Sequence, residues 1–230
     1  MFNLEDGIKW YLVFLFSTTL HEAAHAWTAL KLGDDTAARS GQVTLNPAPH
    51  IKREPFGMVV VPLATYLMSG WMIGWASAPY NPRWALQFPQ RSALMALAGP
   101  AANFLLVIIS AILIKIGIGA GVFSVPAAID FLTVTEGSGD GMAVFAAEMV
   151  SLFFSLNLLL GCFNLLPLPP LDGSSLPLLF VRGKLAETLQ SFLWTPTTSW
   201  AGIIIAWNVF QYVYEPVQLS AVRLLYPGMF

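Results

Sequence analysis

Two histidines and a glutamate stand within five residues of the chain, in the order His21-Glu22-Ala23-Ala24-His25. On a helix, residues four apart differ by about 40° in direction and about 6 Å in rise, so both imidazoles project from one face and can bind one metal ion. Glu22 lies where zinc proteases keep a carboxylate beside the attacking water instead of on the metal. The motif therefore indicates zinc-assisted hydrolysis of a peptide bond, with Glu22 as general base.

The motif lies inside an apolar run, residues 8–32, which is long enough to cross a bilayer. The chain contains 3 histidines, and the motif uses two of them. The alternative is that the polar residues of the motif only pack helices together. Ionisable groups at membrane depth cost roughly 3 kcal/mol or more each unless they are paired or functional, so a cluster of three favours function.

Catalytic zinc takes a third protein ligand and keeps one position open. The carboxylates near apolar segments are Glu148, Asp172 and Glu215, together with Asp130, Glu136 and Asp140 in one loop. Asp172 is favoured because the proline-rich residues 164–171 must break a helix, and irregular backbone at membrane depth is tolerated where it lines a cavity. With Asp172 and Glu22 ionised, the charges around Zn²⁺ sum to zero. The alternative is a turn aspartate just outside the membrane.

The composition is that of an integral membrane protein. Only 10% of the 230 residues are charged, against about 25% in an average soluble domain, and 56% are hydrophobic. We expect an all-α membrane protein with five to six transmembrane helices, five of them at residues 8–32, 56–77, 92–120, 142–166 and 199–225. Lys and Arg divide evenly between the two sides that these spans define, so the positive-inside rule gives no orientation.

The connections between these spans carry further signals. The polar residues 33–55 contain an alternating stretch, residues 41–45, followed by Asn46-Pro47, which predicts a short β-strand or hairpin between the first and second helices. Residues 122–141 are expected to form a flexible loop, and residues 174–198 an interfacial or partly inserted helix. No internal repeat or low-complexity tract is visible, so residues 1–230 are expected to form a single membrane-embedded domain.

Charge and cysteine usage exclude other classes of protein and site. A net charge of -2 without a basic tract argues against nucleic-acid binding. The single cysteine, Cys162, can form no intrachain disulfide and is expected to be a small buried residue. We therefore do not expect nucleic acid as a partner. The composition instead predicts contact with the lipid bilayer.

With these elements in hand, the sequence resembles the site-2 protease family (M50) of intramembrane zinc metalloproteases, in its minimal form without a PDZ or CBS domain. The landmarks occur in order, as HEAAH at 21–25, LNPAPH at 45–50, AGPAAN at 98–103, NLLP at 164–167 and LDG at 171–173. The resemblance implies one zinc ion per chain, held by His21, His25 and Asp172, with catalysis by Glu22. It also implies cleavage within transmembrane segments of membrane-protein substrates.

The resemblance places two asparagines, Asn103 and Asn164, beside the metal. There an amide could donate to the developing oxyanion or hold an unwound substrate strand. From the residues alone, Asn103 would be an interhelical hydrogen-bonding residue and Asn164 a cap near a helix end. Asn157 is expected to serve packing.

His50 is a weaker candidate, as a transient ligand or an inhibitory contact, against the alternative of a solvated loop histidine. The family commonly continues from this histidine with one residue, an acid and a proline, whereas Ile51-Lys52-Arg53 follow here. A second departure is Ser174, which stands where the family often has another glycine.

The function expected from these residues is that of a zinc metalloendopeptidase acting in regulated intramembrane proteolysis. The alternatives are a membrane metal-ion transporter and a catalytically silent, membrane-protein-binding relative. Glu22 separates them, because a transporter needs no water-activating carboxylate and a silent relative would be expected to lack it. We expect a prokaryotic plasma membrane, with a plastid membrane as the alternative, and transmembrane proteins or peptides as substrates. A homo-oligomer is left open.

Overall fold

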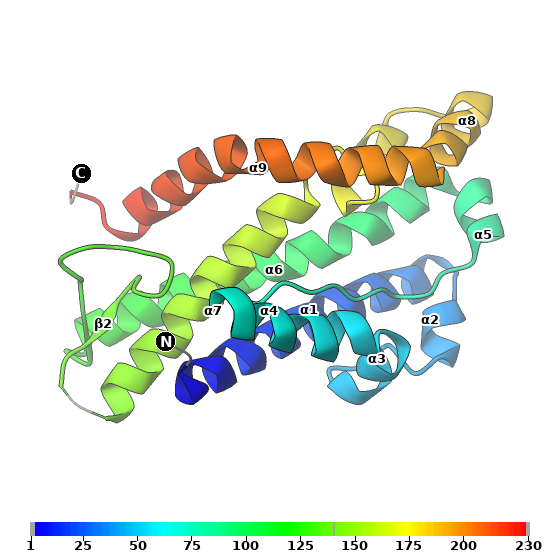
Figure 1. Ribbon diagram of the computed structural model, residues 1–230. Coiled ribbons are helices and arrows are strands. Elements are labelled where there is room, and N and C mark those ends of the chain that lie inside the picture. The colour runs from blue at the N-terminus through cyan, green and yellow to red at the C-terminus, as the bar shows by residue number, and fades with distance from the viewer. Residues whose placement is uncertain (1–2, 140, 229–230) are drawn as a thin grey trace.

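Three long helices, α1 (Leu4–Leu32), α6 (Pro89–Gly119) and α7 (Met142–Asn164), form the body of the computed structural model, and α6 packs against both of the others (Figure 1). The structure describes residues 3–139 and 141–228, and 73% of it is helical. The predicted α class is therefore confirmed in its general form. Asp140, one of the carboxylates considered from the sequence, lies outside the described residues.

The ends of α1 are set by residues suited to helix termini. Oδ1 of Asn3 accepts a hydrogen bond of 3.0 Å from the N–H of Glu5, and Glu5 and Asp6 place negative charge at the positive end of the helix dipole. Gly33 ends the helix with a φ of 104°, a left-handed conformation that glycine adopts without a steric penalty. Residues 4–32 consequently form one uninterrupted helix that carries the whole His-Glu-His motif.

Two helices in the described part of the chain, α6 and α7, are both long enough and apolar enough to cross a membrane by themselves. Their most apolar stretches have mean hydropathies of 2.3 and 1.9. Helices α1 and α9 (Pro196–Leu225) have 29 and 30 residues but do not reach the same apolar composition. Composition and length thus support two spans directly, instead of the five or six expected.

The expected span at residues 56–77 is wrong in its second half. A π-helical turn, η1 (Phe56–Val60), and α4 (Val61–Ser69) form a continuous helical segment that ends at Gly70, where φ is 76°. These 14 residues measure about 21 Å at 1.5 Å per residue, less than the hydrocarbon thickness of about 30 Å. Residues 70–81 then run back in extended form along α1 (Figure 1). Hydropathy alone could not distinguish this reversal from a longer helix.

The predicted strand at residues 41–45 is also wrong. The structure has turns there, between α2 (Thr36–Arg39) and α3 (Pro47–Arg53). Asn46 caps α3 by accepting a 3.0 Å hydrogen bond from Ala48, and Pro47 suits the first helical position. The strands in the described residues are β1 (Phe123–Ser124) and β2 (Glu136–Gly137), an antiparallel pair between α6 and α7. A short alternating stretch forms no strand unless it has a partner.

The C-terminal third contains the predicted helix break. Helix α7 ends at Asn164, and an irregular stretch leads to the 3₁₀ helix η2 (Asp172–Leu179). The amphipathic helix α8 (Gly183–Leu193) follows, buries Ala186 and leaves Leu185 exposed, as expected of an interfacial helix. Helix α9 then crosses the outside of α7 (Figure 1). The short α5 (Pro82–Gln87) lies between the extended segment and α6.

Candidate metal centre

His21 and His25 of α1 meet Asp172 at the start of η2. The two histidine Nε2 atoms are 3.0 Å apart, and Oδ2 of Asp172 lies 3.2 Å from Nε2 of His21 and 3.4 Å from Nε2 of His25. Zinc bonds of about 2.1 Å in a tetrahedron separate neighbouring ligand atoms by about 3.4 Å. The three atoms thus form a triangle that one zinc ion fits.

Glu22 lies beside this triangle. Its side chain is buried, and ligand atoms of His21, Glu22 and His25 all lie within 4.8 Å of one another. A carboxylate at this place can exchange a proton with a water molecule that approaches the metal position. The geometry therefore suits the general-base role that the spacing predicts.

Both histidines are oriented by acceptors on α6. Nδ1 of His21 lies 2.6 Å from Oδ1 of Asn103, and Nδ1 of His25 lies 2.8 Å from the carbonyl oxygen of Met95. An oxygen acceptor at Nδ1 requires the proton on that nitrogen, which leaves the Nε2 lone pair free for a metal. Helix α6 thus fixes the tautomer of each imidazole.

Gly99 of α6 lies directly behind the two imidazoles. A methyl group at this position would overlap Nε2 of both His21 and His25. Met95, Gly99 and Asn103 follow one another at intervals of four residues and therefore lie on one face of α6. On this face, Met95 and Asn103 supply the two acceptor oxygens, and Gly99 between them leaves space for the imidazoles. The lack of a side chain at Gly99 thus lets α6 approach the two imidazoles of α1 closely.

The carboxylate ligand is held by tight packing of the irregular stretch before η2. Gly173 contacts the backbone of Leu165 so closely that a methyl group would not fit. Gly202 of α9 does the same against the carbonyl of Pro169. Oδ2 of Asp172 lies within 3.4 Å of Nε2 of both histidines, so the packing of this stretch keeps the carboxylate beside them.

The two candidate asparagines differ in their surroundings. Asn103 is fully buried and also donates to Oδ1 of Asn157 over 2.8 Å. Asn164 is half-buried at the end of α7, and its amide donates to the carbonyl of Leu160 over 3.1 Å. The predicted substrate or oxyanion role of each stays a prediction. Their spacing along the sequence did not reveal that Asn103 contacts His21.

His50 is not a solvated loop residue. It lies on α3 with 1% of its surface exposed, and its Nε2 lies 3.1 Å from the carbonyl oxygen of Thr44. Within residues 3–139 and 141–228, the cluster of close potential ligand atoms comprises His21, Glu22 and His25, which Asp172 approaches, and His50 is not part of it. Its predicted transient or inhibitory contact stays a prediction.

The other carboxylates considered as ligands are engaged elsewhere or remote. Glu148 of α7 pairs with Lys9 of α1 over 2.7 Å, and Asp130 accepts hydrogen bonds from the backbone of Leu132 and Thr133. Glu215 lies on α9 and Glu136 on β2. Asp172 is thus the candidate carboxylate that the structure brings to the two histidines.

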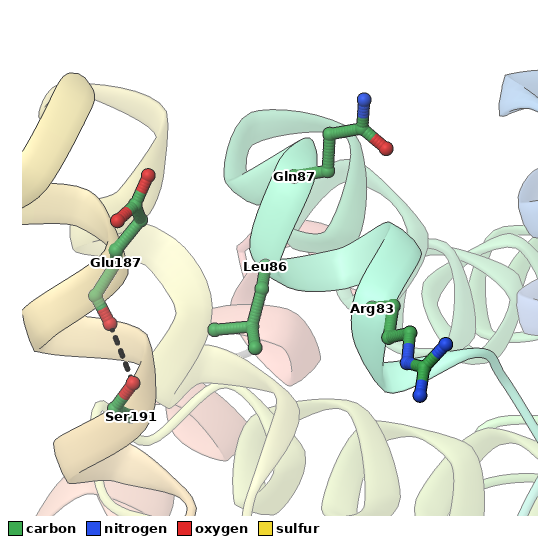
Figure 2. Close-up of a pocket in the computed structure, with 5 residues that line it drawn as sticks. All are labelled: Arg83, Leu86, Gln87, Glu187 and Ser191. Atoms are coloured by element: carbon green, nitrogen blue, oxygen red, sulfur yellow. Dashed lines mark hydrogen bonds between the residues drawn. The ribbon is translucent and has the colours of Figure 1, made fainter.

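A surface hollow of about 450 Å³ lies away from this centre, between α5 and α8 (Figure 2). Its lining residues are Arg83, Leu86, Gln87, Glu187 and Ser191. The side chains of Arg83 and Glu187 point away from each other in Figure 2, and the wall between them is Leu86. Ligand sites need polar groups that converge, so this hollow does not compete with the metal centre as an active site.

The family model for peptidase family M50 matches residues 10–195, which include the motif, the Asn103 face of α6 and Asp172. The chain belongs to peptidase family M50. The M50 match ends before α9, the helix that packs against the loop leading to Asp172.

Two curated relatives carry the name of a zinc metalloprotease. YwhC of Bacillus subtilis (strain 168) is 37% identical over 172 residues, which cover 71% of this chain and 65% of that protein. Rip2 of Mycolicibacterium smegmatis is 29% identical over 160 residues, which cover 69% of this chain and 52% of that protein. The chain therefore spans less than two thirds of the length of each relative. No solved structure matches significantly.

Proposed function

We propose that this M50 chain is a zinc metalloprotease that hydrolyses peptide bonds within transmembrane segments of membrane proteins. The observation that carries the proposal is the convergence of His21, His25 and Asp172 within 3.4 Å, with Glu22 buried beside them. Family membership supports it, because the matched region contains all four residues.

In the proposed mechanism, Nε2 of His21, Nε2 of His25 and the Asp172 carboxylate would hold zinc. When bound, zinc polarises the scissile carbonyl and lowers the pKa of a water molecule toward about 7. Glu22 accepts the proton of the attacking water and afterwards gives it to the leaving amine. Each imidazole keeps its Nδ1–H in a hydrogen bond to an oxygen of α6, which leaves its Nε2 directed at the metal position.

The substrate helix must unwind before hydrolysis, and residues 70–81 offer an edge for the unwound segment. The N–H of Asn81 donates to Oδ2 of Asp34 over 2.7 Å, and Gly74 lies against Phe14. These two anchors bracket the motif along α1. Within the described residues, the backbone N–H groups of residues 76–78 have no hydrogen-bond partner. An extended substrate could pair with these groups.

We further propose a multi-pass protein of a prokaryotic plasma membrane, in which α1 and α9 cross the bilayer beside α6 and α7. Helices α2, α3, α5 and α8 gather toward one end of the molecule (Figure 1). That end, together with the adjoining ends of α1 and α6, carries eight of the 11 cationic side chains: Lys31, Arg39, Lys52, Arg53, Arg83, Arg91, Arg182 and Lys184. By the positive-inside rule, this cationic end faces the cytoplasm.

In this proposal the charge divides unevenly, because residues 56–77 do not count as one span. Helix α4 runs toward the end where Tyr66 hydrogen-bonds to Asn3, and residues 70–81 return along α1. Arg91 consequently lies beside the end of α1, where its side chain donates to the carbonyl of Leu32 over 3.0 Å.

Thiol labelling tests this orientation. A membrane-impermeant maleimide should label Glu136→Cys in intact cells and should label Gln87→Cys only after the membrane is opened. Both positions are exposed, and Gln87 lies at the cationic end. The reverse labelling pattern would overturn the orientation.

The activity is tested with purified protein in liposomes that also contain a single-span substrate. We expect mass spectrometry to locate the cut inside the apolar segment, and a zinc chelator to abolish it. Cleavage confined to soluble loops would refute the intramembrane assignment. Accumulation of zinc inside the liposomes without any cleavage would instead establish the transporter alternative.

A further inference from the structure

A buried chain of hydrogen bonds extends from His21 away from the metal position. Nδ1 of His21 contacts Oδ1 of Asn103 over 2.6 Å, Nδ2 of Asn103 contacts Oδ1 of Asn157 over 2.8 Å, and Nδ2 of Asn157 contacts Oγ of Ser17 over 2.9 Å. Asn103, Asn157 and Ser17 are each 0% exposed. The chain thus crosses the core from α1 through α6 to α7 and back.

In this chain of hydrogen bonds, the donor and acceptor atoms of both asparagines are fixed. Besides Ser17, the amide of Asn157 donates to the carbonyl oxygen of Phe153 over 2.9 Å. This carbonyl belongs to the backbone of α7 and can only accept, so Nδ2 of Asn157 must face it and Oδ1 must face Asn103. Asn103 must then present its amide to Asn157 and its oxygen to His21. A flip of either asparagine would set two acceptors or two donors against each other in a buried place.

We infer that Asn103 and Asn157 are positioning residues. The Phe153 carbonyl fixes the orientation of the Asn157 amide, which in turn fixes that of the Asn103 amide. The oxygen of Asn103 then holds the Nδ1–H of His21 and so keeps the Nε2 lone pair directed toward zinc. This inference rests on the proposed zinc site. His25 obtains the same constraint in one step, from the Met95 carbonyl. For His21 the constraint needs three successive hydrogen bonds, because no backbone carbonyl contacts its Nδ1 among the described residues. In this inference, Asn103 acts through His21 and needs no contact with the substrate.

The same argument explains why amides serve here. The side-chain amide of asparagine has one acceptor atom and one donor atom. It can therefore accept from one neighbour and donate to the next, which keeps the order of donors and acceptors without adding charge to the buried core. A leucine of similar size would pass on nothing. An aspartate at position 103 would still accept from His21 but could not donate to Asn157.

Zinc affinity, measured by competition with a chelator, tests the inference. We expect Asn103→Leu to weaken zinc binding by about 10- to 100-fold, the usual cost of losing the partner of a metal-bound histidine. Asn157→Leu should weaken it less, because Asn103 keeps its contact with His21 but can then flip. Asn103→Asp should restore most of the affinity. Ser17→Ala should leave it unchanged, since the Phe153 carbonyl still sets the direction.

Ser110→Ala is the matched control, because Ser110 is buried on α6 but takes no part in the chain of hydrogen bonds. The absorption spectrum of the Co²⁺-substituted protein gives a second readout, which should change with Asn103→Leu and not with Ser110→Ala. If Asn103→Leu folds and binds zinc as tightly as the wild type, the inference is wrong while the protease proposal stands. If the wild type itself binds no zinc, both are wrong. Should Asn103→Leu fail to fold, Asn157→Leu decides: wild-type zinc affinity in it overturns the inference.

Discussion

Nε2 of His21, in the first helix, lies 3.2 Å from Oδ2 of Asp172, which follows the helix break after α7. The proposed metal centre therefore joins the first helix of the protein to a loop that is held by α7 and α9. Because its proposed ligands come from both sides, the site is assembled only when the tertiary structure is formed. The metal and the fold are expected to stabilise each other.

Removal of zinc should lower the stability of the folded protein. A ligand that binds only the native state stabilises it by about 4 kcal/mol when its concentration is 1,000 times its Kd. We expect a chelator to lower the melting temperature of the wild type and to leave that of Asp172→Ala unchanged. An equal decrease in both proteins would show that the chelator acts elsewhere.

Asp172→Ala should reduce zinc affinity by more than the roughly 10- to 100-fold that the loss of an outer partner costs. The substitution removes one of three converging ligand atoms and leaves both histidines in place. Zinc content after dialysis is the measurement. Glu148→Ala is a suitable control, because that carboxylate pairs with Lys9 away from the centre. Wild-type zinc content in Asp172→Ala would show that another residue completes the site.

Gly99→Ala should disturb the centre although it removes no functional group. Its methyl group would overlap Nε2 of both histidines, and such overpacking costs typically about 1–3 kcal/mol. Gly119→Ala on the same helix meets no atom within 4 Å and serves as the control. We expect loss of zinc and of cleavage in the first variant and neither in the second. Normal zinc binding by Gly99→Ala would mean that α6 packs less closely than the structure shows.

Ala76→Pro should weaken substrate binding without affecting zinc. Proline removes one of the unpaired N–H groups proposed to bind the unwound substrate. A lost hydrogen bond is worth about 1 kcal/mol, which corresponds to about a fivefold higher KM. Ala76→Ser keeps the N–H and is the control. An unchanged KM in the proline variant, with zinc content as in the wild type, would remove residues 70–81 from the substrate path.

Local sequence patterns predicted the chemistry better than the path of the chain. The spacing of His21 and His25 depends on helix geometry alone, and the prolines before Asp172 break a helix in any context. These features were therefore visible in the sequence. The reversal at Gly70 and the turns at residues 41–45 depend on packing against α1 and on the lack of a partner strand, which no local pattern contains.

The orientation of the histidines was hidden for a different reason. The carbonyl of Met95 leaves no signature in side-chain chemistry, because every residue has a carbonyl. Asn103 and Asn157 were visible as polar residues in apolar helices, but their pairing is a tertiary contact between α6 and α7. Only the four-residue spacing of Met95, Gly99 and Asn103 could have indicated one continuous face.

The most direct test of the account compares the wild type with Glu22→Gln, measuring bound zinc and cleavage of a single-span substrate in the same preparations. Glu187→Gln, an exposed change on α8, is the control. We predict one zinc ion per chain in all three proteins, with cleavage abolished in Glu22→Gln alone. Undiminished cleavage by zinc-loaded Glu22→Gln would contradict the assignment of Glu22 as the general base of a metalloprotease.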